Sequence, residues 1–276
     1  MRLFVLYAVT AALALPVKAE QLQIFDAHIH YSHDAVKLVP PLEAARTLRE
    51  AGLRRALVSS SDDNGTQLLR AAAPDLVVPA LRPYRRRGET SSWINDPTII
   101  QYVEDNLKKN TYFAIGEFHA FGTDIESPVV QRIIELAKTH RLLLHAHSDA
   151  DAIERIFKTD PRARVLWAHS GFDRPESVRR MLRKHKNLWA DLAFRNDHAT
   201  GKQVAAEWRA AFEEFPDRFM VGTDTFAPER WYYVSEHAAD ARNWMSSLPP
   251  ELARKIAYEN AETMLDLAAP ANIKTQ

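Results

Sequence analysis

The sequence predicts an α/β chain folded as one (β/α)₈ barrel. First, eight strand-like runs alternate with helix-like runs over about 250 of the 276 residues, the size of a TIM barrel. Second, strands that alternate with helices pair in parallel through right-handed crossovers, and eight such units can close a barrel. Third, no Gly-x-Gly-x-x-Gly follows the first strand, which disfavours the alternative, a doubly wound open sheet. No linker or low-complexity tract divides the chain, so we expect a single domain over residues 20–276.

The predicted strands are short runs rich in apolar and β-branched residues. The first begins with the alternating run Gln21-Leu22-Gln23-Ile24 and leads into Phe25-Asp26-Ala27-His28-Ile29-His30. Because residues two apart in a strand point to the same face, Asp26, His28 and His30 are expected to share one. The other seven strands are predicted over 54–60, 76–84, 112–119, 141–148, 164–170, 188–194 and 218–223.

The predicted helices show apolar residues at helical spacing and recognisable ends. Gly52 ends the first, Pro74 ends the second, and Asp96-Pro97 begins the third after a polar loop over 85–95. Helices between strands are predicted over 38–51, 64–73, 96–109, 128–140, 150–158, 176–185 and 202–215. Two further helical patterns, over 236–246 and 250–267, place an extra helix at the C-terminal end.

Composition excludes several kinds of chemistry. Lys+Arg and Asp+Glu balance at 36 each, so bulk charge gives no reason to expect nucleic acid or an acidic lipid surface as a partner. The chain has no cysteine, which rules out a thiol nucleophile, a disulfide and thiolate ligation of a metal. Any bound metal must therefore have nitrogen and oxygen ligands.

The first 19 residues resemble a cleavable secretory signal. Arg2 supplies the positive start, Leu3 to Leu15 form an apolar core, and Val17-Lys18-Ala19 ends on a small residue. The core is short for a membrane span, so we prefer cleavage near Ala19 over an uncleaved anchor. These features predict an exported protein, periplasmic or secreted, that is free of the membrane after cleavage.

Residues of metal-ligand type stand late in six different predicted strands, after an apolar run in each. Taken singly, each is better explained as a core or loop residue with ordinary hydrogen bonds. Their convergence on the C-terminal ends of barrel strands, where barrel enzymes carry their chemistry, indicates a metal site. His140, His185 and His237 fall in helices and are expected to be surface residues. The late-strand residues are His28, His30, Glu117, His119, His145, His147, His169, Asp191 and Asp224.

The motifs Asp26-Ala27-His28-Ile29-His30, Gly116-Glu117, His145, His169-Ser170-Gly171, Gly222-Thr223-Asp224 and Asn260-Ala261-Glu262 resemble the amidohydrolase superfamily. The resemblance is to its amidohydrolase-related, type 2 metal-dependent hydrolases, and it extends from the first strand to the last helix. It implies that His28, His30, Glu117, His145 and Asp224 bind a divalent metal, one or two ions, zinc before manganese. It also implies catalytic roles for Asp224, as proton acceptor, and for His169, as a second ligand or a substrate contact. His147 shares a face with His145 and is the alternative ligand.

Loops after the strands suggest the substrate. Arg82, His147 and Arg195 are candidate substrate contacts, because arginine beside a metal suits a carboxylate or phosphate. The expected function is metal-activated hydrolysis of a small, anionic or cyclic ester, lactone or amide. Alternatives are a metal-dependent non-oxidative decarboxylase, a TatD-like nuclease, for which no basic stripe is evident, and a metal- or solute-binding barrel without turnover. The sequence is compatible with a homo-oligomer and does not decide the oligomeric state.

Overall fold

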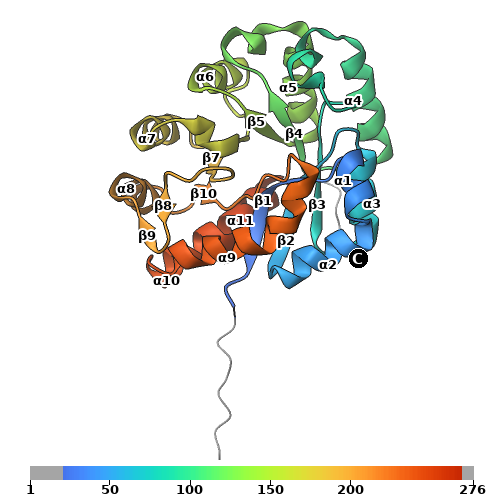
Figure 1. The fold of residues 1–276 in the computed structure, drawn as a ribbon. Helices are drawn as coiled ribbons and strands as arrows, with labels where there is room; N and C mark the ends of the chain where they lie inside the picture. Colours follow the sequence, from blue (N-terminus) through green and yellow to red (C-terminus); the bar gives the residue numbers. More distant parts are fainter. Residues whose placement is uncertain (1–20, 269–276) are drawn as a thin grey trace, which may run out of the picture.

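The computed structural model describes residues 21–268, and the predicted signal segment lies outside them. Eight parallel strands follow one another around a barrel in chain order (Figure 1). Backbone hydrogen bonds from Ala27 to Val221 (2.9 Å) and from Asp224 to His28 (2.8 Å) join the last strand to the first. The strands are β1 (Ile24–His30), β2 (Leu53–Ser59), β3 (Val77–Leu81), β4 (Ala114–His119), β5 (Leu143–His147), β6 (Val165–Trp167), β7 (Leu188–Asp191) and β10 (Phe219–Met220).

Helices surround the barrel and alternate with its strands, which confirms the predicted fold class and single domain (Figure 1). Within residues 21–268, none of them has the length and hydropathy of a membrane span. The helices are α1 (His33–Leu38), α2 (Pro41–Glu50), α3 (Asn64–Ala72), α4 (Thr98–Lys109), α5 (Pro128–His140), α6 (Ala150–Thr159), α7 (Pro175–Lys184), α8 (Ala206–Glu214), α9 (Val234–Met245), α10 (Pro250–Arg254) and α11 (Asn260–Ala268).

Two predicted helices begin later than expected. The pattern over 38–51 gives α2, which begins only at Pro41 because Pro40 and Pro41 interrupt the backbone hydrogen bonding, and the short helix α1 that precedes it was not predicted. The pattern over 202–215 gives a small hairpin, β8 (Ala199–Thr200) and β9 (Gln203–Val204), before α8 begins. Both changes lie in loops at strand ends and leave the barrel order intact.

The apolar core has two parts. A large cluster fills the space between the strands and the outer helices, and a smaller one fills the barrel interior around Phe25, Leu57 and Trp189. Met264 and Leu265 of α11 belong to the inner cluster. Arg164, just before β6, donates to the Met264 carbonyl (3.0 Å), so α11 covers the N-terminal end of the barrel. The opposite end, where the strands terminate, is left for polar side chains.

Candidate active site

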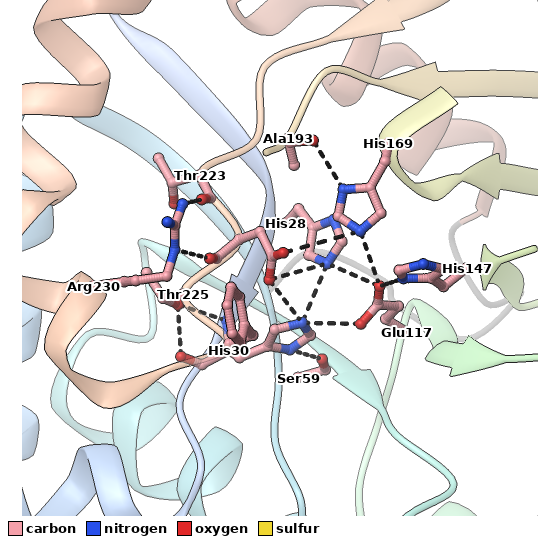
Figure 2. Close-up of polar contacts among 12 residues, drawn as sticks. His28, His30, Ser59, Glu117, His147, His169, Ala193, Thr223, Thr225 and Arg230 are labelled. Carbon is pink, nitrogen blue, oxygen red and sulfur yellow. Dashed lines mark hydrogen bonds and ion pairs between the residues drawn. The ribbon is translucent and has the colours of Figure 1, made fainter. Parts of the chain in front are cut away.

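Five buried side chains converge at the C-terminal end of the barrel (Figure 2). His28 and His30 extend from β1 and Glu117 from β4. His169 lies in the short 3₁₀ segment after β6 (η4, Ala168–Phe172), and Asp224 follows β10. All five were predicted from the sequence as site residues, and the structure brings their polar atoms together.

The spacing of these atoms suits a common ion. His30 Nε2 lies 3.2 Å from His28 Nε2, 3.1 Å from Glu117 Oε2 and 3.4 Å from Asp224 Oδ1. Ligand atoms about 2.0–2.2 Å from one metal lie at roughly such separations from each other. Asp224 Oδ1 is buried and has no hydrogen-bond partner among the described residues, although burying such an oxygen unpaired is costly. A divalent cation at this point would satisfy it, so the residues fit a metal.

The second nitrogen of each imidazole is held by a neighbour. His28 Nδ1 lies 3.2 Å from Asp191 Oδ2, and His169 Nδ1 donates to the Ala193 carbonyl at 2.8 Å. His30 Nδ1 lies 2.9 Å from the Ser59 hydroxyl. Such contacts place the proton on Nδ1 and direct the Nε2 lone pair of His28 and His169 toward the shared centre, as in metal sites whose ligands are oriented by a second carboxylate or carbonyl.

Asp191, at the end of β7, is the residue whose role the sequence analysis missed. Its Oδ2 contacts both His28 Nδ1 and His145 Nε2 at 3.2 Å, and its Oδ1 accepts from the backbone N–H of His169 (2.9 Å) and Ala193 (3.0 Å). Burial opposes its charge, but the neighbouring His28 and the hydrogen bond from His145 hold the pKa of Asp191 far below its ordinary value. Its position as the late polar residue of a strand was the available signal.

The fifth strand carries two histidines at different depths. His145 lies beneath the group, with its Nε2 on Asp191 and its ring 4.4 Å from that of His28. His147 lies nearer the mouth, and its Nδ1 is 2.8 Å from Glu117 Oε1, on the side where His169 Nε2 is 3.4 Å from the same oxygen (Figure 2). The structure therefore places His147, and not the favoured His145, beside the predicted bridging carboxylate.

The cluster keeps Glu117 ionised and His30 neutral. Burial disfavours the Glu117 charge, but His28 and hydrogen bonds from His147 and His169 hold its pKa well below the ordinary value. Burial lowers the pKa of His30 to about 4, with a further contribution from the positive charge of Arg82. A carboxylate and a neutral imidazole are the forms that bind metals.

Local backbone geometry explains the glycines in the predicted motifs. His169, Ser170 and Gly171 all have left-handed φ angles of 55°, 51° and 65°, and a Cβ on Gly171 would lie 2.2 Å from the Trp167 ring. Gly222 packs against His28, whose Cβ would be 2.8 Å from an added Cβ. Small residues are required here because the chain passes so close to the ligand strands.

The first strand departs from strict alternation. Its pairing with β2 is irregular between Asp26 and Ile29, but His28 and His30 point the same way as predicted, with their Nε2 atoms 3.2 Å apart. The Asp26 Oδ1 instead accepts from the backbone N–H of His28 (3.0 Å) and Thr223 (3.1 Å). Asp26 thus ties β1 to the Gly-Thr-Asp segment and does not join the imidazoles.

Arg82 and Arg195, both predicted to contact substrate, have different surroundings. Arg82 donates to Glu117 Oε2 (2.8 Å) and lines the cavity of about 330 Å³ above the cluster. The structure does not bring Arg195 into this group. Its guanidinium donates to the carbonyl oxygens of His169 (3.0 Å) and Asp173 (2.9 Å), pairs with Asp197, and thereby fixes the loop after β7.

Comparison with known proteins agrees with this fold. A probable 2-pyrone-4,6-dicarboxylic acid hydrolase from Acinetobacter baumannii superimposes with a TM-score of 0.60 at 12% identity, over 88% of this chain and 99% of its own. A TatD homolog from Escherichia coli gives 0.62 at 15% identity, over 88% and 98%. A lactonase variant from Deinococcus radiodurans gives 0.56 at 13%, over 91% and 98%. No curated protein matches the sequence.

The family model named amidohydrolase matches residues 111–267, which is more than half of the chain. The matched range includes the Gly-Glu, His-Ser-Gly and Gly-Thr-Asp motifs, and the His-x-His of β1 precedes it. The chain therefore belongs to the amidohydrolase family and is a metal-dependent hydrolase.

Proposed function

We propose that this chain is an exported enzyme that hydrolyses a small, anionic ester, lactone or amide by means of a metal-activated water molecule. The observation that supports it most strongly is the buried Asp224 Oδ1, which has no hydrogen-bond partner within residues 21–268 and lies 3.4 Å and 3.8 Å from the Nε2 atoms of His30 and His28. Zinc is the proposed metal, with manganese as the alternative, because the donors are imidazole nitrogens and carboxylate oxygens.

The proposed ligands of the first ion are His28, His30, Glu117 and Asp224. A second ion would be held on the other side of Glu117, between its Oε1, His147 and His169, where the two imidazoles already face that oxygen. His147 replaces His145 in this assignment because its Nδ1 lies 2.8 Å from Glu117 Oε1, whereas the Nε2 of His145 lies 3.2 Å from Asp191 Oδ2. Asp191 is the buried carboxylate that orients His28.

A divalent ion in such a site polarises a substrate carbonyl and lowers the pKa of bound water from about 15.7 toward 7. Asp224, whose side chain lines the cavity, is positioned to accept the proton of the attacking water and to return it to the leaving group. His169, which also lines the cavity, contacts the substrate oxygen when it is not engaged as a ligand. Arg82 lines the same cavity and carries the positive charge that would attract an anionic group.

A cyclic ester is the first substrate class to test. Two of the similar solved structures are described as a 2-pyrone-4,6-dicarboxylic acid hydrolase and a lactonase. Their resemblance in fold, together with Arg82 at the cavity, supports lactones and anionic esters ahead of amides.

The test is a panel of lactones, esters, amides and carboxylic acids offered to the zinc- or manganese-loaded protein in ¹⁸O-labelled water. We expect ¹⁸O in the product for at least one class, and a loss of about 10²–10⁴-fold in kcat for Asp224→Asn, the usual contribution of a positioned acid–base group. The exposed Asp217→Asn is the matched control and should keep full activity. Undiminished turnover in Asp224→Asn, or release of carbon dioxide with no ¹⁸O incorporation, would contradict the proposal.

Export is tested separately. We expect the protein expressed from residues 1–276 in a Gram-negative host to be found in the periplasm, with the mass of a chain that begins at Glu20. Intact protein retaining residues 1–19 in the cytosol would contradict the proposed localisation.

A further inference from the structure

The mouth of the cavity above the proposed metal ligands carries three phenylalanines that are about half exposed. Phe172, Phe194 and Phe226 have exposed fractions of 51%, 52% and 48%, and all three line the cavity that Glu117 and Asp224 also line. They come from different segments, namely the one after β6, the loop after β7 and the loop after β10. Apolar surface gathered at one cavity, rimmed by polar residues, marks a binding surface.

Each phenylalanine has a fixed orientation relative to the site. The Phe172 ring stacks on the His169 ring, with centroids 4.6 Å apart and planes at 14°. The Phe194 and Phe226 rings meet edge to face at 5.5 Å. These contacts produce two preformed aromatic surfaces, of which one is stacked nearly parallel on a site imidazole.

Arg230 holds the second surface in place. Its guanidinium lies over the Phe194 ring at 4.8 Å and the Phe226 ring at 5.5 Å. The same guanidinium donates to the backbone carbonyls of Asp224 (2.6 Å) and Thr223 (2.7 Å) (Figure 2). The aromatic pair is therefore tied to the segment that carries Asp224, so its distance from the reacting position is set by the fold.

We infer that the substrate carries a planar apolar ring, which binds between Phe172 and the Phe194–Phe226 pair while the bond to be hydrolysed lies over Glu117 and Asp224. This inference rests on the proposed function and adds the ring as the part of the substrate that the mouth recognises. Stacking and edge contacts favour a planar π-system over a puckered ring of similar size. A cavity of about 330 Å³ is at the lower end of the range for small-molecule sites, which suits a substrate of one ring and a short side chain.

The experiment measures binding by titration calorimetry on the zinc-loaded wild-type protein, with carboxylates that resemble hydrolysis products and undergo no hydrolysis themselves. The ligands are 3-phenylpropanoate, 3-cyclohexylpropanoate and propanoate. We expect the phenyl compound to bind at least tenfold more tightly than propanoate, about 1.4 kcal/mol, and more tightly than the cyclohexyl compound. Equal affinities for phenyl and cyclohexyl ligands, or for phenylpropanoate and propanoate, would overturn the inference.

Variants assign the preference to the named rings. Phe172→Ala and Phe194→Ala should each weaken 3-phenylpropanoate about tenfold and leave propanoate within about twofold, since each removes one aromatic surface. Tyr233→Ala is the matched control, because Tyr233 is an equally exposed aromatic residue (52%) that does not line the cavity. Unchanged phenyl affinity in both phenylalanine variants would overturn the inference, as would a shift of the oligomeric state by Phe172→Ala, which would identify the mouth as an interface between copies.

Turnover of a simple lactone without an aromatic ring separates this inference from the proposed function. If δ-valerolactone is hydrolysed but the phenyl preference is absent, the inferred substrate ring is wrong and the hydrolase assignment is supported. If the phenyl preference is present but no lactone, ester or amide is hydrolysed, the ring-binding surface is supported and the proposed reaction is wrong.

Discussion

Replacing Asp191 by Asn should weaken metal binding without removing any proposed ligand. The Asp191 Oδ2 lies 3.2 Å from both His28 Nδ1 and His145 Nε2. An amide nitrogen in that place would present a donor to two imidazole nitrogens. The proton of His28 would then move to Nε2, the atom that the proposed metal needs unprotonated. Because the exchange of carboxylate for amide is nearly isosteric, the packing should otherwise persist.

The expected loss is 10–100-fold in metal affinity, the usual effect of removing the partner that orients a ligand histidine. This corresponds to about 1.4–2.8 kcal/mol of binding free energy. Since neighbouring histidines hold the pKa of Asp191 far below its ordinary value despite burial, mild acid leaves it charged and substitution is the cleaner perturbation.

Zinc affinity is measured by competition with a chromophoric chelator at pH 7.5. The control is Asp160→Asn, which replaces another buried aspartate, next to the loop before β6 and remote from the cluster. If Asp191→Asn binds zinc within about twofold of wild type, or if Asp160→Asn loses as much affinity, Asp191 does not orient a metal ligand.

Three further predictions concern stability. Gly116→Ala should yield little soluble protein, because its Cβ would lie 2.1 Å from the His145 carbonyl oxygen; wild-type yield and circular dichroism would contradict this. Burial raises the pKa of Asp63 from 3.8 to about 6. The protonated carboxyl therefore stabilises the folded state: this stabilisation is full below pH 4 and is lost as the pH rises through 6. Urea titration at pH 4 and pH 8 gives the free energy of unfolding of Asp63→Asn minus that of wild type. This difference should rise by about 3 kcal/mol from pH 4 to pH 8, and a pH-independent difference would refute the prediction. Arg242→Ala should lower Tm by several degrees, since it removes three donations to backbone carbonyls near the first strand, and Arg46→Ala, on an exposed helix face, is the control.

The barrel could be predicted because its signals are local. Each strand is a short apolar run, each helix has its own spacing and ends, and eight repetitions of that pair leave few arrangements of the chain. The added hairpin over 199–204 and the short helix α1 depend on loop packing, which local pattern does not encode, whereas the later start of α2 at Pro41 follows from the local Pro40-Pro41 pair.

The convergence of His28, His30, Glu117, His169 and Asp224 could be predicted because all lie late in strands, or just after strands, that end on the same side of the barrel. The choice between His145 and His147 as the ligand from the fifth strand could not be predicted. Both lie on one strand two residues apart, and their depth depends on how β5 is staggered against its neighbours.

Asp191 and Arg195 show a second limit of sequence reasoning. A carboxylate at a strand end has the same pattern whether it binds a metal or holds the histidine that does. An arginine in a strand-end loop has the same pattern whether it faces the substrate or, like Arg195, donates to the carbonyls of His169 and Asp173. Only the contacts distinguish these roles.

The metal content of the protein, purified without chelators and measured by elemental analysis, shows whether the residues around Glu117 and Asp224 hold a metal. We expect one or two zinc or manganese ions per chain, lost in a His28→Ala/His30→Ala variant and retained when the exposed His140 is replaced by Ala. Two ions would assign His147 and His169 to a second site beside Glu117, and one would leave them as substrate contacts. No bound metal, even after reconstitution with zinc or manganese, would contradict the account.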